Sequence, residues 1–300
     1  MNIMITGGTG FLGSALSRSL LADGHAVFIL TRAPQRARLP AGAQAVGWDG
    51  RTCQGWLELF GEMDAVFNLA GASIGQPPWS AQRKNILVQS RVNAGVALNQ
   101  AFQKAAKKPG FLVQSSGVGY YGVHGAEPLN EDTPAGNDFL ASLAVDWEVS
   151  TKIVDSLGVR RVVTRTGIVL GHKGLLPQMS LPVRLFLGGP TGTGQQGVSW
   201  IHVDDYVRAM RYLLENEKAR GIYNLVAPNP LSNADFMRLL ARALHRPAWL
   251  TTPAFALRGL LGEMSTLLLD GQYVIPQRLV NLGFDFKFGS VSEAFRQEYS

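Results

Sequence analysis

The sequence predicts an α/β fold, a doubly wound parallel sheet that carries a smaller C-terminal α/β lobe. Three observations predict it. Short apolar runs alternate along the chain with longer helical patterns. The runs are apolar at nearly every position, as in parallel strands that are buried on both faces. A glycine-rich turn also lies between the first run and the first helical pattern, where folds of this class bind their ligands.

Most predicted strands come from the first 170 residues. Residues 2–6 form the first run, and leucines at positions 12, 16 and 20 then follow at helical spacing until Gly24. Because crossovers between parallel strands are right-handed, the predicted arrangement is that of a Rossmann fold. Further strands are predicted at residues 26–31, 43–48, 65–70, 111–115 and 160–170, and helices at 81–107, 139–157 and 204–216.

The pattern changes near residue 170 and divides the chain into two parts. Residues 1–170 form the predicted cofactor-binding domain. From Gly171 onward the sequence is irregular and rich in proline and glycine, which predicts a smaller substrate lobe over residues 171–300. Residues 222–226 are again a predicted strand, which is expected to return to the sheet. The lobe and the sheet are therefore expected to interleave.

Composition narrows the possible classes of function. With 46% hydrophobic and 17% charged residues among 300, the chain can bury a core. The single cysteine, Cys53, allows no internal disulfide, which fits a reducing compartment. No secretory leader pattern or run of ~18 apolar residues is present, so we expect a cytoplasmic protein with no membrane partner. The alternative is an organelle that holds the mature chain.

The net charge of +6 is compatible with nucleic acid, a membrane surface or an anionic small ligand. Arg238, Arg242 and Arg246 form one stripe on a predicted helix, but no aromatic platform or nucleic-acid motif accompanies them. We therefore expect no nucleic-acid partner. No cluster of cysteine and histidine has metal-ligand spacing, so no metal is expected.

The glycine-rich turn has the spacing that a diphosphate requires. Gly7, Gly10 and Gly13 lie three residues apart between the first strand and the first helix. Such glycines allow a sharp turn, a close approach of the diphosphate and tight packing of helix on strand. The amides of Gly10, Phe11 and Leu12 would lie at the helix N-terminus, where the dipole favours anions. The alternative is a glycine-rich turn without a ligand.

The second strand ends in Thr31 and Arg32, where NAD-binding proteins carry an acidic residue for the ribose hydroxyl. An arginine at this position pairs instead with the 2′-phosphate of NADP, and Thr31 adds a hydroxyl. A charge-assisted hydrogen bond contributes ~1.5–3 kcal/mol, which is enough to prefer NADP over NAD. The alternative is a solvated surface arginine.

Short motifs along the whole chain carry a resemblance to a known family. They are T-G-G-T-G-F-L-G at residues 6–13 and the motifs at residues 68–71, 90–91, 119–122, 165–171, 188–190, 200–205, 261–264, 271–276 and 282–284. Together they resemble an atypical extended short-chain dehydrogenase/reductase. More narrowly, they resemble the epimerase-like family with a C-terminal domain of unknown function, whose members are sometimes labelled cell-division inhibitors.

The resemblance implies that NADP contacts follow the ends of several strands. For Arg91, on the helix after the fourth strand, the alternative is an ordinary helix-surface arginine. The implied contacts are Gly7, Gly10, Phe11 and Leu12 to the diphosphate, Thr31 and Arg32 to the ribose phosphate, Leu69, Ala70 and Gly71 along the path to the nicotinamide, Arg91 near the phosphates, and Val169 near the nicotinamide.

The catalytic residues of the superfamily are absent in the matching register. Its reductases use Ser or Thr to orient the substrate, Tyr as the acid or base, and Lys to lower the pKa of that Tyr. Here Phe139 stands at the Tyr position, Leu143 at the Lys position and Gly117 at the Ser position. Neither Phe139 nor Leu143 can exchange a proton, and Gly117 has no hydroxyl to orient a substrate.

Nearby hydroxyls offer a substitute. Tyr120 or Tyr121 could supply the proton, with Ser116 or Ser115 orienting the substrate. The alternative is that both tyrosines only pack beside the nicotinamide. Two functions follow, either an NADP-dependent oxidoreductase of an unknown small substrate or a catalytically inactive NADP-binding sensor or regulatory protein.

Two further positions bear on the substrate. Nucleotide-sugar epimerases carry an arginine that grips the substrate diphosphate, and Val198 stands at that position here. A nucleotide-sugar substrate is therefore disfavoured. His202 is predicted to be structural, and Asp204 is predicted to cap the following helix.

Overall fold

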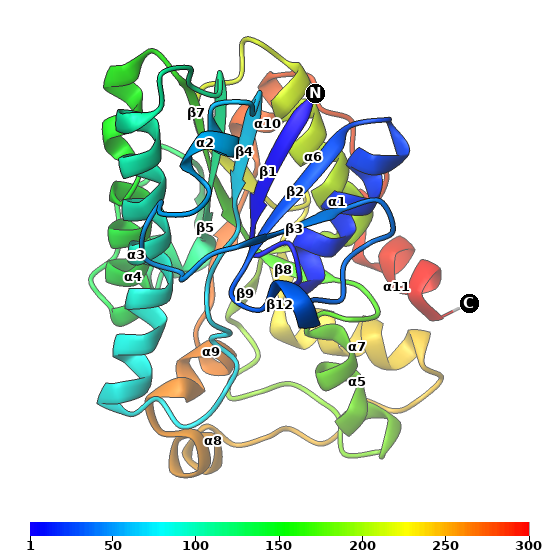
Figure 1. Cartoon of the computed structure of the whole chain (residues 1–300). Coiled ribbons are helices and arrows are strands. Elements are labelled where there is room, and N and C mark those ends of the chain that lie inside the picture. The colour runs from blue at the N-terminus through cyan, green and yellow to red at the C-terminus, as the bar shows by residue number, and fades with distance from the viewer. Residues whose placement is uncertain (300) are drawn as a thin grey trace.

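The computed structural model describes residues 1–299. A parallel sheet of seven strands lies at the centre of the molecule, in the order β11-β7-β5-β4-β1-β2-β3 (Figure 1). This confirms the doubly wound α/β class. The strands are β1 (Asn2–Thr6), β2 (Ala26–Thr31), β3 (Gln44–Gly47), β4 (Ala65–Asn68), β5 (Phe111–Gly117), β7 (Arg160–Thr166) and β11 (Gly221–Leu225).

Helices cover both faces of the sheet. The helices α1 (Phe11–Ala22) and α6 (Val203–Glu215) pack together on one face, and α3 (Ala81–Lys104) and α4 (Phe139–Val149) on the other (Figure 1). Along β1 the side chains of Ile3 and Ile5 join the core beneath α1 and α6, whereas Met4 joins the core beneath α3. Successive residues alternate between two apolar layers, so the whole strand is apolar.

The lobe is built on short strands and helices with a core of their own. Trp200, Phe236 and Phe295 are fully buried in it. Ser300, the last residue of the predicted lobe, lies outside the described residues. The lobe elements are β8 (Ile168–Leu170), α5 (Leu176–Arg184), β9 (Gly197–Val198), β10 (Trp200–His202), β12 (Leu231–Ser232), α7 (Asn233–Ala243), α8 (Ala254–Leu261), α9 (Thr266–Leu269), α10 (Gln277–Asn281) and α11 (Val291–Tyr299), and β13 (Tyr273–Val274) pairs with β6 (Pro128–Leu129).

Two predicted elements are each divided. The strand predicted at residues 160–170 breaks at Gly167, where β8 leaves the sheet and pairs with β10. A Cβ at Gly167 would lie 2.5 Å from the carbonyl oxygen of Ser199, so the backbones meet there without room for a side chain. The helix predicted at residues 139–157 stops at Val149, and a 3₁₀ turn (Lys152–Leu157) follows.

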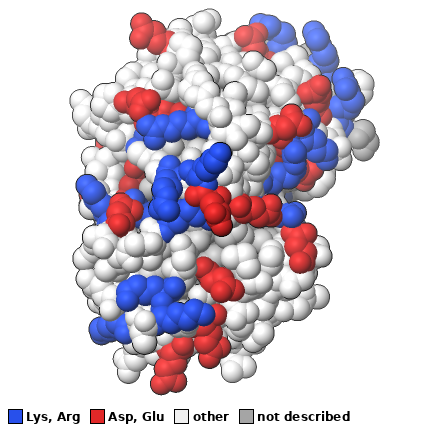
Figure 2. Space-filling model, turned by 90° about the horizontal axis from the view of Figure 1, so that it is seen from above, with Lys and Arg blue, Asp and Glu red and all other residues white. Residues whose placement is uncertain are grey.

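Seen from above, at the amino ends of the strands, lysines and arginines lie beside aspartates and glutamates (Figure 2). β11 returns to the sheet beside β7 after the chain has built part of the lobe. The division of the chain near residue 170 stays a prediction. Within residues 1–299, no helix combines the length and apolarity that a membrane crossing requires.

Candidate cofactor and substrate site

The carboxyl ends of the central strands meet at one edge of the sheet. Thr6 at the end of β1 pairs with Asn68 at the end of β4, and Asn68 pairs with Gln114 in β5. The segments that follow β1, β2 and β4 therefore start from the same edge, where ligands bind in open α/β sheets. Among the predicted cofactor residues from Gly7 to Gly71, Thr31 is the last residue of β2 and the others lie on these segments.

The glycine turn has the geometry that the spacing predicts. Gly7 has a φ of +70°, and a Cβ on it would lie 2.6 Å from the carbonyl oxygen of Leu69. A Cβ on Gly13 would lie 2.4 Å from the carbonyl oxygen of Gly7, so α1 packs directly on the turn. Gly10 is the N-cap of α1 and supplies no side-chain cap. The first amides of the helix are therefore left to an external anion.

The residues after Gly10 pack against the start of the lobe. A Cβ on Gly171 would lie 2.8 Å from the Phe11 ring, and one on Gly174 would lie 2.9 Å from it. Phe11 and Leu12 are both partly buried. Val169, on β8, is buried in the same core cluster that Phe11 and Leu12 contact. The lobe therefore touches the glycine turn from the side where the nicotinamide contact was predicted.

Arg32 is exposed at the end of β2. A Cβ on Gly50 would lie 3.6 Å from its Cδ, so its stem runs along the turn after β3. No ion pair of the described residues includes Arg32. The Thr31 hydroxyl accepts only a long bond of 3.4 Å from the amide of Ala33. Both side chains are free for a phosphate.

Arg91 is buried, and no carboxylate within residues 1–299 forms an ion pair with it. Its side chain extends from α3 and donates a hydrogen bond of 3.0 Å to the carbonyl oxygen of Leu87. Its guanidinium carbon lies 4.7 Å from the centroid of the Trp147 ring. A Cβ on Gly71 would lie 3.0 Å from that carbon. Burial, with the charge of Arg83, lowers the pKa of Arg91 to about 10, so it stays charged at neutral pH.

A charged group without a counter-ion is costly to bury. The ion pairs of the described residues do not include Arg91. The helix-surface alternative for Arg91 is wrong, because only 8% of the residue is exposed. Its guanidinium instead lies against the segment after β4, where an anion would compensate it.

A buried polar chain that the sequence analysis missed supports the floor of this site. The Thr6 hydroxyl donates a hydrogen bond of 2.7 Å to Oδ1 of Asn68, and Nδ2 of Asn68 donates one of 2.8 Å to Oε1 of Gln114. The amide of Ala70 in turn donates 3.1 Å to the Thr6 hydroxyl. These bonds fix the backbone at Leu69 and Ala70. The signal was available, since three polar residues, Thr6, Asn68 and Gln114, stand in predicted buried strands and must find partners.

Two of the three candidate catalytic hydroxyls point into the interior. The Ser116 hydroxyl donates 2.7 Å to the carboxylate of Glu148. Tyr121 is fully buried, and its hydroxyl donates 2.7 Å to Asn224. Burial raises the pKa of Tyr121, although Arg165 opposes the shift. Tyr120 is the member of the trio that is partly exposed.

A buried ion pair that the sequence analysis missed lies beneath these residues. Arg165 on β7 contacts Glu148 on α4 through two bonds, of 2.8 and 3.0 Å. The same guanidinium donates 3.2 Å to the Tyr121 hydroxyl, and its carbon lies 3.2 Å from the Tyr120 ring centroid. The pair therefore holds both tyrosines in position.

The positions that hold Tyr and Lys in the superfamily are filled by packed apolar groups. The Phe139 ring meets the Trp79 ring edge-on, with 5.4 Å between centroids. Leu143 is buried in the same cluster, which Met264 and Leu267 of the lobe also contact. This part of the site offers no proton donor of the usual kind.

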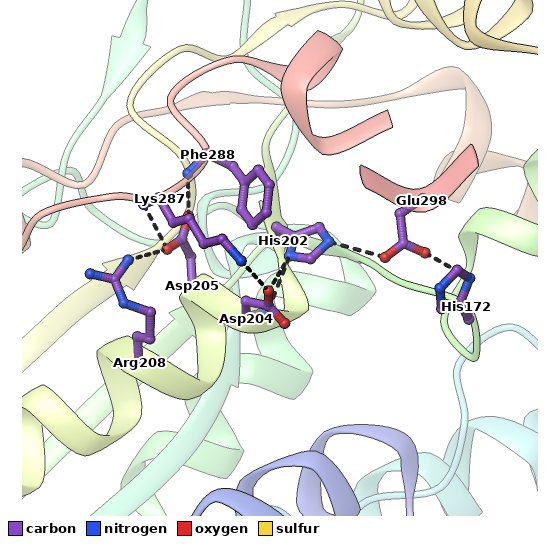
Figure 3. A network of polar contacts seen from close by, with 8 residues as sticks. All are labelled: His172, His202, Asp204, Asp205, Arg208, Lys287, Phe288 and Glu298. Carbon is purple, nitrogen blue, oxygen red and sulfur yellow. Dashed lines mark hydrogen bonds and ion pairs between the residues drawn. The ribbon is translucent and has the colours of Figure 1, made fainter. Parts of the chain in front are cut away.

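His202 joins the lobe to α6 (Figure 3). Its side chain is buried, with 2% of the residue exposed. Its Nδ1 accepts a hydrogen bond of 3.2 Å from the backbone amide of Asp204, and its Nε2 lies 3.0 Å from Oε1 of Glu298. His202 is therefore the N-cap, and the prediction that Asp204 caps α6 is wrong. Asp204 lies in the first turn and pairs with Lys287 at 3.0 Å.

The neighbouring carboxylate of Asp205 fastens the C-terminal segment onto the same helix (Figure 3). It is 1% exposed and accepts 2.9 Å from the amide of Lys287 and 2.8 Å from that of Phe288. Arg208 donates a further bond of 2.7 Å to it. The structural role predicted for His202 thus extends to the residues around it.

Two family descriptions match the chain. The NAD dependent epimerase/dehydratase family matches residues 3–225. A C-terminal domain of unknown function, DUF1731, matches residues 252–298. The first match spans the sheet with the glycine turn, and the second spans the C-terminal part of the lobe.

Named relatives are similar over nearly the whole chain. The epimerase family protein YfhF of Bacillus subtilis is 39% identical over 299 residues, which cover 99% of this chain and 97% of that protein. The chloroplastic epimerase family protein SDR39U1 homolog of Arabidopsis thaliana is 38% identical over 301 residues, covering 99% and 86%. The second relative is named for an organelle, so a cytoplasmic location for the present chain stays a prediction.

A solved structure has the same fold. Human epimerase family protein SDR39U1, solved with NADPH, superposes with a TM-score of 0.87 at 32% identity and covers 100% of this chain and 99% of that one. The resemblance seen in the sequence motifs is confirmed. With these relatives above 30% identity and the family match over residues 3–225, the chain belongs to the NAD dependent epimerase/dehydratase family.

Proposed function

We propose that the chain binds NADP(H) at the carboxyl edge of the sheet. The observation that carries the proposal is the buried cation Arg91, which lies against Gly71 without a carboxylate partner. The glycine turn would hold the diphosphate, and Thr31 with Arg32 the 2′-phosphate. The NADPH in the human relative supports this choice. The cytoplasm, where thiols stay reduced, is the proposed compartment.

Replacing Arg32 by alanine is expected to remove the preference for NADPH. The loss of a charge-assisted bond worth ~1.5–3 kcal/mol weakens NADPH binding by roughly ten- to a hundredfold and leaves NADH binding unchanged. Fluorescence titration with both nucleotides measures this. Arg296→Ala, an exposed arginine on α11, is the matched control. Equal affinities of the parent protein for NADPH and NADH would contradict the assignment of Arg32.

The proposed reaction is the reduction of a small carbonyl substrate. NADPH, when bound, would supply a hydride to the carbonyl carbon. The carbonyl oxygen then needs a proton, and we place its donor at Tyr120, the partly exposed hydroxyl of the trio. Ser116 and Tyr121 act through the buried network that positions Tyr120. Val198 is buried at the position of the diphosphate-binding arginine, so the proposed substrate is not a nucleotide sugar.

The proton-donor role can be tested with two conservative variants. Tyr120→Phe is expected to lower the NADPH-dependent turnover of a carbonyl panel by about a hundredfold or more, with NADPH affinity unchanged. Tyr121→Phe removes a buried bond and is expected to reduce stability more than the rate of proton transfer. Steady-state rates and thermal unfolding separate the two effects. If neither variant changes turnover, the role of Tyr120 is refuted.

The second candidate function is a catalytically inactive NADP(H) sensor. It is favoured by the apolar packing of Phe139 and Leu143, which leaves the usual proton donor and its lysine replaced. In that case NADPH would raise the unfolding temperature of the parent protein, while no member of the carbonyl panel would be reduced. Turnover of any panel member by the parent protein, abolished in Tyr120→Phe, decides for the oxidoreductase.

A further inference from the structure

The end of the lobe away from the amino edge of the sheet exposes large apolar side chains. Trp249 is 71% exposed, Phe255 78% and Leu260 81%. Leu185, Phe186 and Leu187, which follow α5, are more than half exposed as well. We call these six residues the lobe tip. In Figure 1 the segments that carry them lie at the lower end of the molecule, around α5 and α8.

The two chain segments of the lobe tip lie side by side. The amide of Thr252 donates 2.9 Å to the carbonyl oxygen of Pro190, and a Cβ on Gly189 would lie 2.4 Å from the carbonyl oxygen of Leu250. The Arg246 guanidinium carbon lies 4.8 Å from the Phe186 ring centroid. The segments around Phe186 and Leu250 are therefore neighbours, and Phe255 and Leu260 follow them on α8 at the same end of the molecule (Figure 1).

The net positive charge of the chain comes from two sequence segments that include the lobe tip and also extend beyond it. Residues 171–203 and 236–262 contain six of the 28 lysines and arginines and none of the 22 aspartates and glutamates. The rest of the chain holds 22 residues of each sign, so these two segments account for the whole net charge of +6. The amino edge of the sheet, with its mixed charges in Figure 2, is the opposite case.

The basic residues of these segments are mostly free. Arg238 pairs with Asp235, but the ion pairs of residues 1–299 include none of the other five, which are Lys173, Arg184, Arg242, Arg246 and Arg258. If a second copy of this chain bound at the lobe tip, the basic residues of the two copies would face each other, and the repulsion between like charges would weaken binding. Arg258 has Asp270 as an acidic neighbour, but the other exposed cations have no such counter-charge among the described residues, so charge complementarity favours an anionic partner.

We propose that the lobe tip binds the surface of an anionic lipid bilayer. Aromatic and leucine side chains that project this far from a protein can enter the boundary between headgroups and acyl chains, as monotopic proteins do. Arg184, Arg246 and Arg258 would meet the lipid phosphates, and each basic residue near such a surface adds to binding. Binding to the bilayer surface needs no membrane-crossing helix. The proposal replaces the expectation from the sequence that the protein has no membrane partner.

The proposal is tested by sedimentation of the full chain with vesicles. We expect binding to vesicles of equal parts phosphatidylglycerol and phosphatidylcholine at least tenfold tighter than to phosphatidylcholine alone, and weaker binding when salt is raised from about 0.05 to about 0.5 M. Phe255→Ser with Leu260→Ser, and separately Arg246→Glu with Arg258→Glu, should each lower binding at least tenfold. Val123→Ser with Val149→Ser, two exposed apolar residues elsewhere, is the matched control and should bind as the parent does.

Other outcomes overturn the proposal. Absence of sedimentation with anionic vesicles refutes it, and equal binding to both vesicle types refutes the role of the arginines. A dimer in solution that the Phe255→Ser, Leu260→Ser variant dissociates would assign the lobe tip to a second copy. Binding of the parent to an acidic peptide but not to vesicles would assign it to a protein. NADPH titration of each variant monitors the cofactor site separately, so failure here leaves the proposed function untouched.

Discussion

Replacing Glu148 by alanine is expected to destabilise the protein by about 3–5 kcal/mol. The substitution would leave the buried guanidinium of Arg165, which is 1% exposed, without its counter-charge. Removing one partner of a buried ion pair costs more stability than replacing both partners by apolar side chains. It also removes the acceptor of the Ser116 hydroxyl. Urea unfolding of the parent and the variant measures the difference.

Two controls give this experiment its meaning. Asp146→Ala removes an exposed carboxylate two residues earlier on α4 and should change stability by less than about 0.5 kcal/mol. The double variant Glu148→Leu, Arg165→Met replaces both charges and should recover most of the loss. If Glu148→Ala cost no more than Asp146→Ala, the pair would not support the site as described.

Adding one methyl group at Gly13 is expected to disrupt cofactor binding. The Cβ of Gly13→Ala would lie 2.4 Å from the carbonyl oxygen of Gly7, a backbone atom that cannot rotate away. Either α1 or the glycine turn must shift, and the helix N-terminus then no longer faces the diphosphate. We expect NADPH affinity to fall at least about tenfold by fluorescence titration, together with a lower unfolding temperature.

The control substitution, Gly259→Ala, should not lower the stability of the protein. Gly259 lies inside α8, and a Cβ there meets no atom within 4 Å. Alanine is favoured over glycine in a helix by about 1 kcal/mol, so Gly259→Ala should be neutral or stabilising and should bind NADPH as the parent does. A normal NADPH affinity in Gly13→Ala would show that the close packing of α1 on the turn is not required.

The sheet could be predicted because its signals are local. β1 and β2 begin and end where the apolar runs do, since each run is buried on both faces and is bounded by polar residues or glycine. The break at Gly167 could not be predicted in this way, because the cause is the Ser199 backbone, which approaches from a distant part of the chain. In the sequence, Thr164, Arg165, Thr166 and Gly167 interrupt the apolar residues on either side, but this interruption alone does not show that β8 leaves the sheet.

The candidate site was predictable in the same measure. The glycine turn, Thr31 and Arg32 are recognised by their place between elements, which the sequence displays. The fate of Tyr121 depends on Asn224, 103 residues further along the chain, and that of Ser116 on Glu148. Such partners are set by tertiary packing. The sequence therefore shows which hydroxyl groups are present near the site, but not the direction in which each one points. A buried arginine in an apolar strand, Arg165, was the one visible hint of the network.

The return of β11 to the sheet has a consequence for how the protein is made. β11 can pair with β7 only after residues 167–220, which include part of the lobe, have left the ribosome. Until residue 225 has been synthesised, β7 pairs with β5 on one side only, and its other side is an open edge that can pair with other chains. The C-terminal segment then closes on α6 through Asp205. The nascent sheet therefore stays exposed to misassembly until late in translation, and cutting the chain near residue 170 would not release a completed domain.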